Sequence, residues 1–507
     1  MKFVDFLRYS PISKGSNLIF TIAPLVKKEY TKLSTIVFKG DVCYNPPFAE
    51  YFRLIGTGLG LKMTTENNGS QSASNLKLIL RALKHRNYRL FFAGQGISVI
   101  GTWMQQAALG WLVYRLTNSE FYLGLVSFSG QIPILLGCLI GGDFADRWPR
   151  RRIVIITQIM AMIQAFALAL IVAFHIVTIP KIILLSILLG IVNAFDMPTR
   201  QAFVVEMVDD KKDLPNAIAL NSLIFNLARQ IGPMVAGFLI AQVGEASCFF
   251  INAISFIAVI YSLAAMRLTH STQTKHNGAM LSGIKDGVSY AFGFMPIRSI
   301  LLYTAAMCFV SMPYAVLLPV FAKSILHGGP QTYGLLLWST GIGAFIGALL
   351  LARRKTVHGL EKVVVTAAGI FSAGVIGFSF SRNIWLSILL IALPGYGIMV
   401  QLASINTILQ SIVDDHMRGR VLSLHVMAFI GMAPFGSLLS GYLAEHIGAP
   451  HTVLISGILS FIIMLFFAKK LPAIRKLVHP IYVRKGIIPE VAAGLQTAER
   501  FSAETKE

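Results

Sequence analysis

Two long uncharged segments flank one short charged stretch, and this pattern constrains the chain more than any other feature. The charged stretch runs from Gly142 to Arg152 and includes Asp143, Asp146 and several arginines. Residues 121–140 before it and 153–174 after it carry no charge. Each segment is long enough to cross a bilayer of about 30 Å as a helix. The charged stretch is therefore predicted to be a short basic turn between two membrane helices, on the cytoplasmic side.

The composition indicates a polytopic membrane protein. Of the 507 residues, 55% are hydrophobic and 13% are charged, whereas a soluble domain has about 25% charged residues. The net charge of +21 does not indicate nucleic-acid binding, because the basic residues form short clusters between apolar segments, where they fix orientation and meet anionic lipid. The four cysteines, at 43, 138, 248 and 308, are scattered without a CxxC motif, so neither metal binding nor disulfide bonding is expected.

Hydropathy predicts twelve membrane spans. They lie at about residues 90–114, 121–140, 153–174, 182–197, 217–243, 248–266, 299–322, 332–352, 363–380, 384–410, 420–444 and 451–468. The predicted organisation is an N-terminal extension (1–75), a six-helix bundle (76–266), a linker (267–298), a second six-helix bundle (299–470) and a tail (471–507). The extension is expected to be poorly ordered, with Met63 as a hypothetical physiological start. Residues 281–295 are predicted to form an amphipathic helix along the membrane surface.

Basic residues lie mainly in alternate loops, which predicts the orientation. The predicted inner loops contain Arg147, Arg150, Arg151, Arg152, Arg200, Lys211, Lys212, Arg267, Lys275, Lys285, Arg298, Arg353, Arg354, Lys355, Lys362, Arg418 and Arg420. The predicted outer loops contain only Arg115, Lys181, Lys323 and Arg382. By the positive-inside rule, both termini are expected in the cytoplasm.

The two halves of the chain repeat. Val208-Asp209-Asp210, after span 4, recurs as Val413-Asp414-Asp415, after span 10. The segment from Gly237 to Gly244 recurs from Gly441 to Gly448 at almost the same offset. The fold class is therefore predicted to be all-α, with twelve transmembrane helices in two pseudo-symmetric six-helix bundles.

The charged turn is similar to the loop between helices 2 and 3 of the major facilitator superfamily of secondary transporters. The similarity lies in the spacing of Gly142, Asp146, Arg147, Arg150 and Arg151, although Pro149 stands where the family usually has glycine. The segments Asn87-Tyr88-Arg89-Leu90-Phe91, Gly101-Thr102-Trp103, Gly110-Trp111-Leu112-Val113-Tyr114 and 196–203 also resemble the branch that contains the enterobactin exporter.

That resemblance implies a conformational latch at the cytoplasmic side. Asp146 would face the amino end of helix 11, around Gly419, where unpaired amides attract an anion. Arg150 would pair with Asp196 at the end of helix 4, with Arg147 or Arg151 as substitutes. These contacts would form when the cytoplasmic side closes. The alternative for the charged turn is a basic loop that only sets the membrane orientation, and the alternative for Asp196 is a simple cap at the membrane interface.

Span 5 contains Gly232-Pro233-Met234-Val235-Ala236-Gly237, which resembles the Gly-Pro-x-x-Gly-Gly element of antiporters in the superfamily. Proline bends a helix and the small residues permit close packing, so a packing role is the alternative. Arg229 precedes this element inside the span, and an intramembrane charge is a functional hypothesis by default. It would bind an anionic substrate group or sense a proton; alternatively, it lies nearer the cytoplasmic face and pairs with Glu206 or with lipid headgroups.

In this superfamily spans 1, 4, 7 and 10 surround the substrate cavity. The resemblance makes the polar and aromatic residues of those spans candidates for its lining: Trp103, Gln105, Gln106, Asn193, Tyr303, Tyr314, Tyr396, Gln401 and Asn406. Asp196 and His425 are candidates for proton coupling, with a hydrogen-bonded core histidine as the alternative for His425. A cavity of apolar, aromatic and amide groups favours a bulky amphipathic solute.

The expected function is secondary active transport rather than enzymatic catalysis. The resemblance implies proton-driven export across a bacterial inner membrane, with amphipathic molecules such as siderophores or drugs as cargo. No nucleotide-binding P-loop is present, so ATP is not the expected energy source. The proton gradient is expected to supply the energy, and no cofactor is expected. The expected partners are the bilayer and a small molecule, with a monomeric protein. A lipid or lysolipid translocator, or a receptor-like protein without transport, remains the alternative.

Overall fold

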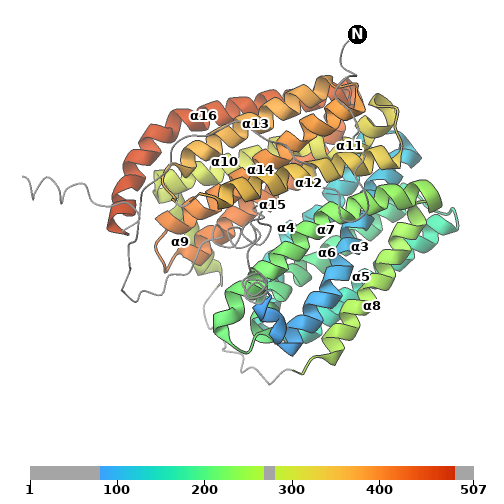
Figure 1. The fold of residues 1–507 in the computed structure, drawn as a ribbon, viewed down its shortest axis with the longest axis horizontal. Coiled ribbons are helices and arrows are strands. Elements are labelled where there is room, and N and C mark those ends of the chain that lie inside the picture. Colours follow the sequence, from blue (N-terminus) through green and yellow to red (C-terminus); the bar gives the residue numbers. More distant parts are fainter. Residues whose placement is uncertain (1–79, 268–279, 355, 486–507) are drawn as a thin grey trace, which may run out of the picture. The chain divides into compact units, whose positions relative to one another are not determined.

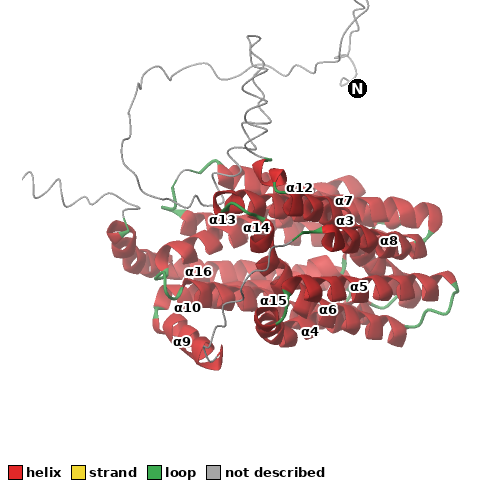
Figure 2. Cartoon of the chain, turned by 90° about the horizontal axis from the view of Figure 1, so that it is seen from below, coloured by secondary structure: helices red, strands yellow, loops and turns green. Residues whose placement is uncertain are grey.

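A computed structural model describes residues 80–267, 280–354 and 356–485. Residues 138–143, 145–147 and 280–285 are described by their backbone alone. The predicted N-terminal extension and Met63 lie outside the described residues. Within the described ranges the chain forms helices and no strands, and the helices run side by side (Figure 2).

Long helices follow the predicted order of spans. Those of the N-terminal half are α3 (Arg86–Thr117), α4 (Glu120–Arg147), α5 (Arg150–Ala173), α6 (Ile179–Val204), α7 (Leu214–Val243) and α8 (Glu245–Ala265). Those of the C-terminal half are α10 (Met295–Val316), α12 (Pro330–Ala352), α13 (Leu360–Phe380), α14 (Ile384–Ile412), α15 (Arg418–Ile447) and α16 (Ala449–Arg484). Shorter elements are η1 (Arg81–Lys84), η2 (Val205–Met207), η3 (Lys211–Asp213), α9 (Met280–Gly293), α11 (Leu318–Val320) and η4 (Phe321–Ile325).

The length and apolarity of the helices identify a multi-pass membrane protein. Among the described residues, ten helices are long and apolar enough to cross a membrane. The helices α3 and α4, with 32 and 28 residues, occupy the positions of the first two predicted spans. Large apolar side chains lie exposed on the helices, including Tyr261 at 71% and Trp385 at 78%. Such a surface suits lipid rather than water.

The same helix pairs pack together in both halves. In the N-terminal half α3 packs against α7 and α8, α4 against α6, and α5 against α6 and α8. In the C-terminal half α10 packs against α15 and α16, α12 against α14, and α13 against α14 and α16. The halves meet where α4 packs against α15 and where α7 packs against α12 (Figure 1). These two contacts are equivalent, because α12 occupies in the C-terminal half the position of α4, and α15 that of α7. The predicted two-bundle pseudo-symmetry is present.

Two of the repeated glycines are required by the backbone. Gly244 and Gly448 each stand alone between two helices, α7 and α8 in one half and α15 and α16 in the other. Both have φ of +82°, a conformation that side chains with a β-carbon disfavour. Each amide donates to the carbonyl four residues earlier, at 3.0 Å and 2.8 Å respectively. The sequence repeat here reflects two equivalent tight turns.

Some helices extend beyond the predicted spans. The predicted span 4 ends at Met197, but α6 continues through Pro198 to Val204. The predicted span 12 ends near residue 468, but α16 continues to Arg484, past the expected start of the tail, with Pro472 and Pro480 inside it. Proline is compatible with membrane helices because neighbouring groups satisfy the freed carbonyls. The helix α9 occupies the stretch predicted to be amphipathic.

Candidate functional site

The ends of the bundle differ in charge and in contacts. We call "basic end" the one where α3, α5, α7, α10, α13 and α15 begin, and "opposite end" the other. The sequence-predicted latch lies at the basic end. Gly142, Asp146 and Arg147 are described by their backbone alone, so the predicted contact of the Asp146 side chain with the start of α15 lies outside the described part of the chain.

Asp196 sits in a buried polar site between α5 and α6. Its residue is 3% exposed. One carboxylate oxygen accepts hydrogen bonds from Thr157 Oγ1 at 2.8 Å and Gln158 Nε2 at 2.9 Å. The other pairs with Arg200 Nη2 at 2.9 Å. The charge is therefore compensated both by an ion pair and by neutral donors, as a buried carboxylate requires.

The predicted Asp196–Arg150 pair is not formed in this structure. Arg150 Nη1 pairs with Glu206 Oε1 at 2.8 Å, and Arg151 donates to the carbonyl oxygens of residues 263 and 264 at the end of α8. The reason is local: Arg200 follows Asp196 by one turn of α6 and reaches the carboxylate without crossing between helices. Helix α6 also continues past the expected end of the span, which brings η2 and Glu206 close to the start of α5.

The glycines of the helix 5 element make close helix contacts. A β-carbon on Gly232 would lie 2.6 Å from the Trp103 β-carbon of α3, and one on Gly237 would lie 2.7 Å from the Pro330 carbonyl oxygen of α12. Gly334 of α12 approaches the Pro233 carbonyl in the same way. These contacts are what the packing interpretation predicts, and they place α7 between its own half and the other half.

Arg229 lies one turn before Pro233, and it forms no ion pair with any residue that the structure describes. Its Nη2 donates to Asn226 Oδ1 at 3.3 Å. The alternative partner considered from the sequence, Glu206, is bound to Arg150 instead.

The predicted cavity residues divide into two sets. Gln105 is 4% exposed and bonds Gln164 of α5 and Asn252 of α8, so it lies inside the N-terminal bundle. Tyr303 donates to Gln401 inside the C-terminal bundle. These placements differ from the predicted lining role, because amides and phenols buried in a bundle find partners there.

The other candidates have different environments. Gln106 is exposed, and Trp103, Asn193, Tyr396 and Asn406 are partly exposed. Trp103 packs edge-on against Phe225 with ring centroids 5.6 Å apart. Tyr314 is 5% exposed. His425 is 6% exposed, and its Nδ1 has no hydrogen-bond partner among the described atoms.

Contacts between the halves gather at the opposite end, and sequence analysis did not find them. Glu445 of α15 accepts hydrogen bonds from Ser119 Oγ at 2.8 Å and from the Phe121 amide at 3.1 Å. It therefore caps the start of α4 from the other half. Tyr114 bonds Ser324 at 2.7 Å.

A lysine and two helix crossings complete this set. Lys323 Nζ donates to Asn118 Oδ1 at 2.6 Å. Between described residues, all four hydrogen bonds that join the halves are at the opposite end. At the same end Gly124 of α4 meets Gly441 of α15, and Gly237 of α7 meets Gly334 of α12. The opposite end is closed.

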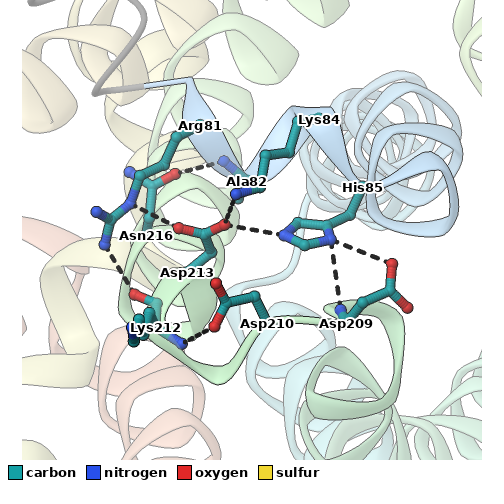
Figure 3. A network of polar contacts seen from close by, with 9 residues as sticks. All are labelled: Arg81, Ala82, Lys84, His85, Asp209, Asp210, Lys212, Asp213 and Asn216. Atoms are coloured by element: carbon teal, nitrogen blue, oxygen red, sulfur yellow. Dashed lines mark hydrogen bonds and ion pairs between the residues drawn. The ribbon is translucent and has the colours of Figure 1, made fainter.

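A polar cluster at the basic end ties the segment before α3 to the loop before α7, and we call it the amino-terminal clasp (Figure 3). Asp213, with a 5% exposed side chain, pairs with Arg81 at 3.0 Å, Lys84 at 2.6 Å and His85 Nε2 at 3.0 Å. The other ring nitrogen of His85 lies 3.2 Å from Asp209 Oδ2. Both ring nitrogens therefore face carboxylates.

The C-terminal half contains a counterpart of this clasp. Tyr290 of α9 donates its hydroxyl to Asp414 Oδ2 at 2.9 Å and accepts from the Asp414 amide at 3.3 Å. In the N-terminal half, His85 Nδ1 lies 3.2 Å from the Asp209 carboxylate oxygen and 3.4 Å from the Asp209 amide nitrogen, and its tautomer decides which of the two it bonds. Each pair is separated by 124 positions. The repeat noticed at Val208 and Val413 was the available signal, but the partners differ in type.

Comparisons with known proteins agree with this architecture. A family described as transmembrane secretion effector matches residues 79–483. The chain is 29% identical over 383 residues to the staphyloferrin A transporter of Staphylococcus aureus, which covers 75% of this chain and 95% of that protein. It is 25% identical over 394 residues to the multidrug efflux pump Tap of Mycolicibacterium fortuitum, with 76% and 94% covered.

Solved structures show the same fold. A point mutant of the nucleoside transporter NupG superposes with a TM-score of 0.60 at 15% identity, over 76% of this chain and 99% of that one. A bacterial homolog to the human lysosomal transporter Spinster, in an inward-facing and occupied conformation, gives 0.60 at 13% identity, over 76% and 96%. The matched family, the doubled bundle and its helix pairing together show that the chain belongs to the transmembrane secretion effector family of the major facilitator superfamily, as a membrane transporter and not an enzyme.

Proposed function

We propose that this protein is a proton-driven exporter of amphipathic small molecules, siderophore-like or drug-like, in a bacterial inner membrane. The basic end faces the cytoplasm, both termini are cytoplasmic, and a single chain is the working unit. The observation that carries the proposal is the one-sided closure: described hydrogen bonds between the halves lie only at the opposite end. With that orientation, closure of the opposite end corresponds to an inward-facing state, which accepts cargo from the cytoplasm.

The relatives support export rather than import. The relatives found by sequence include a transporter of staphyloferrin A, a multidrug efflux pump and a macrolide efflux protein from Streptococcus pyogenes. Cargo as different as this suits a site that selects by apolar surface and a few polar groups.

The energy needed to open the closed end is within reach of a ligand. Four hydrogen bonds, each with a net contribution of about 0.5–1.5 kcal/mol, stabilise closure by roughly 2–6 kcal/mol. A ligand that prefers one state by about 5.5 kcal/mol converts a 1:99 mixture into 99:1. Cargo and protons that bind the two states unequally can therefore drive the two halves between them.

Asp196 and His425 are the proposed sites of proton coupling. Asp196 carries a buried carboxylate whose ion pair with Arg200 would be lost on protonation. His425 is buried and has one ring nitrogen without a described partner, a nitrogen that can accept a proton. Either group changes the charge of the bundle interior when it titrates, which alters the relative stability of the two states.

The test is transport into everted membrane vesicles that contain the protein. A panel of siderophores, cationic dyes and lysolipids is offered with and without an imposed proton gradient, and vesicles without the protein serve as the control. We expect uptake of one or more amphipathic molecules that stops when a protonophore collapses the gradient. Uptake that continues unchanged after collapse would contradict proton antiport. Selective uptake of lysolipids would favour the lipid translocator.

A further inference from the structure

Arg229 lies halfway along α7. The helix begins at Leu214 and ends at Val243, so at 1.5 Å per residue the Arg229 α-carbon is about 22 Å from the start. Neither headgroup region is close to that depth. A guanidinium at this level needs a partner that the protein or its ligand supplies.

The side chain is on the interior face of the helix. Leu227, Ile231, Met234 and Phe238 are 44%, 43%, 50% and 61% exposed, and they form the lipid-facing stripe of α7. At 3.6 residues per turn they lie about 140–180° around the helix axis from Arg229. Arg229 therefore points away from lipid.

That interior face lies where the two halves meet. Gly232 packs α7 against α3 of its own half, and Gly237 packs it against α12 of the other half. Tyr314, from α10 of the C-terminal half, is within electrostatic range of Arg229. A phenol hydroxyl can donate a hydrogen bond to an anion, so the two halves present a guanidinium and a neutral donor to the same region.

Among the described residues, Arg229 forms no ion pair. Its one described hydrogen bond is the 3.3 Å contact with the Asn226 amide oxygen. Three described carboxylates of the N-terminal half have other partners: Asp196 pairs with Arg200, Glu206 with Arg150, and Asp213 with the amino-terminal clasp. An arginine without a counterion is suited to bind a carboxylate through two parallel N–H donors.

We propose that Arg229 binds a carboxylate of the transported molecule, so that the cargo class is amphipathic carboxylic acids. This inference rests on the proposed export function and specifies its substrate class. The anion completes the ion pair that the protein leaves open, and Tyr314 adds a second contact from the opposite half. Because that contact spans the halves, a bound carboxylate links cargo binding to their relative position. A membrane potential that is negative inside also favours outward movement of an anion.

The test is equilibrium binding with two probes that differ in whether their two carboxyl groups are free or methyl-esterified. Dansyl-glutamate and its dimethyl ester share one apolar body, and dansyl fluorescence reports their binding to purified protein in nanodiscs. We expect the wild-type protein to prefer the diacid, and Arg229→Gln to weaken diacid binding by about 10- to 100-fold while diester binding stays unchanged. Arg229→Lys keeps the positive charge but loses the two parallel N–H donors of the guanidinium. Its affinity for the diacid is therefore expected to lie between those of the wild type and Arg229→Gln. Arg382→Gln, in an outer connection, is the matched control.

The outcomes separate this inference from the proposed function. The carboxylate site would be overturned if the wild type bound diacid and diester equally, or if a correctly folded Arg229→Gln bound the diacid as well as the wild type does. Either result would leave the proposed function standing wherever proton-driven uptake of the diester persists. Loss of proton dependence with the diacid preference intact would overturn the proposed function and leave the site standing. Displacement of the diacid by lysophosphatidylglycerol at lower concentration than by glutamate derivatives would assign the site to a lipid phosphate and refute the proposal.

Discussion

Replacement of Gly124 by alanine should open the closed end. A β-carbon at this position would lie 2.5 Å from the Ser437 carbonyl oxygen and 3.0 Å from the Gly441 α-carbon, both on α15. An ordinary contact is about 3.5 Å or more, so α4 and α15 must separate by roughly 1 Å. Such overpacking costs about 1–3 kcal/mol, and the cost falls only on the state in which these two helices touch.

The expected result is a shift of the equilibrium by about 5- to 150-fold toward the state that is open at the opposite end. The assay is the rate at which a membrane-impermeant maleimide labels a cysteine introduced at Leu318, which is 1% exposed at the closed end. The native cysteines are removed first. Labelling should accelerate in Gly124→Ala and remain slow in Gly369→Ala, where an added β-carbon meets nothing within 4 Å.

An unchanged labelling rate in a folded, inserted Gly124→Ala protein would refute this reasoning. It would mean that the glycine contact does not hold the two halves together. A similar increase in Gly369→Ala would also refute it, because the effect would then be a general loosening of the bundle.

Three further changes have defined outcomes. Asp196→Asn removes one partner of a buried ion pair, which should destabilise the protein by about 3 kcal/mol and reduce vesicle transport while membrane insertion is retained. Asp415→Asn, at a pair whose aspartate side chain is 85% exposed, should change neither stability nor transport, and equal effects of the two substitutions would contradict the role assigned to Asp196. Glu445→Gln weakens the cap on α4 by about 1 kcal/mol and should raise the rate of maleimide labelling at the opposite end roughly fivefold. An unchanged labelling rate would show that Glu445 does not hold the two halves together. Tyr290→Phe should speed amide hydrogen exchange in α9, since both bonds of its hydroxyl to Asp414 are lost. Unaltered exchange would show that the Tyr290–Asp414 contacts do not anchor α9.

The fold was predictable because membrane spans and repeats are strong signals. Each predicted span lies within or largely overlaps a helix, since a bilayer permits few other structures. The glycine repeat at Gly244 and Gly448 also has a direct cause in backbone geometry. Helix ends were less predictable, because Pro198 and Pro472 do not terminate helices here.

The contacts within the site were predictable only in part. The sequence indicated that Asp196 is an important acid, but its partner depends on where α6 ends and on which arginine follows by one turn. Gln105 and Tyr303 looked like lining residues, yet they bond inside their own bundles. The trans cap by Glu445 joins residues more than 320 positions apart, and no local pattern marks such a contact.

The central claim is that two rigid halves open one end as they close the other. Pulsed electron paramagnetic resonance can test it with one pair of spin labels at Phe174 and Trp385, exposed at the opposite end, and another pair at Val205 and Leu477, exposed at the basic end. On a change of pH or addition of a transported molecule, the distance within one pair should lengthen while the distance within the other shortens. Distances that stay fixed, or that change in the same direction at both ends, would contradict the account.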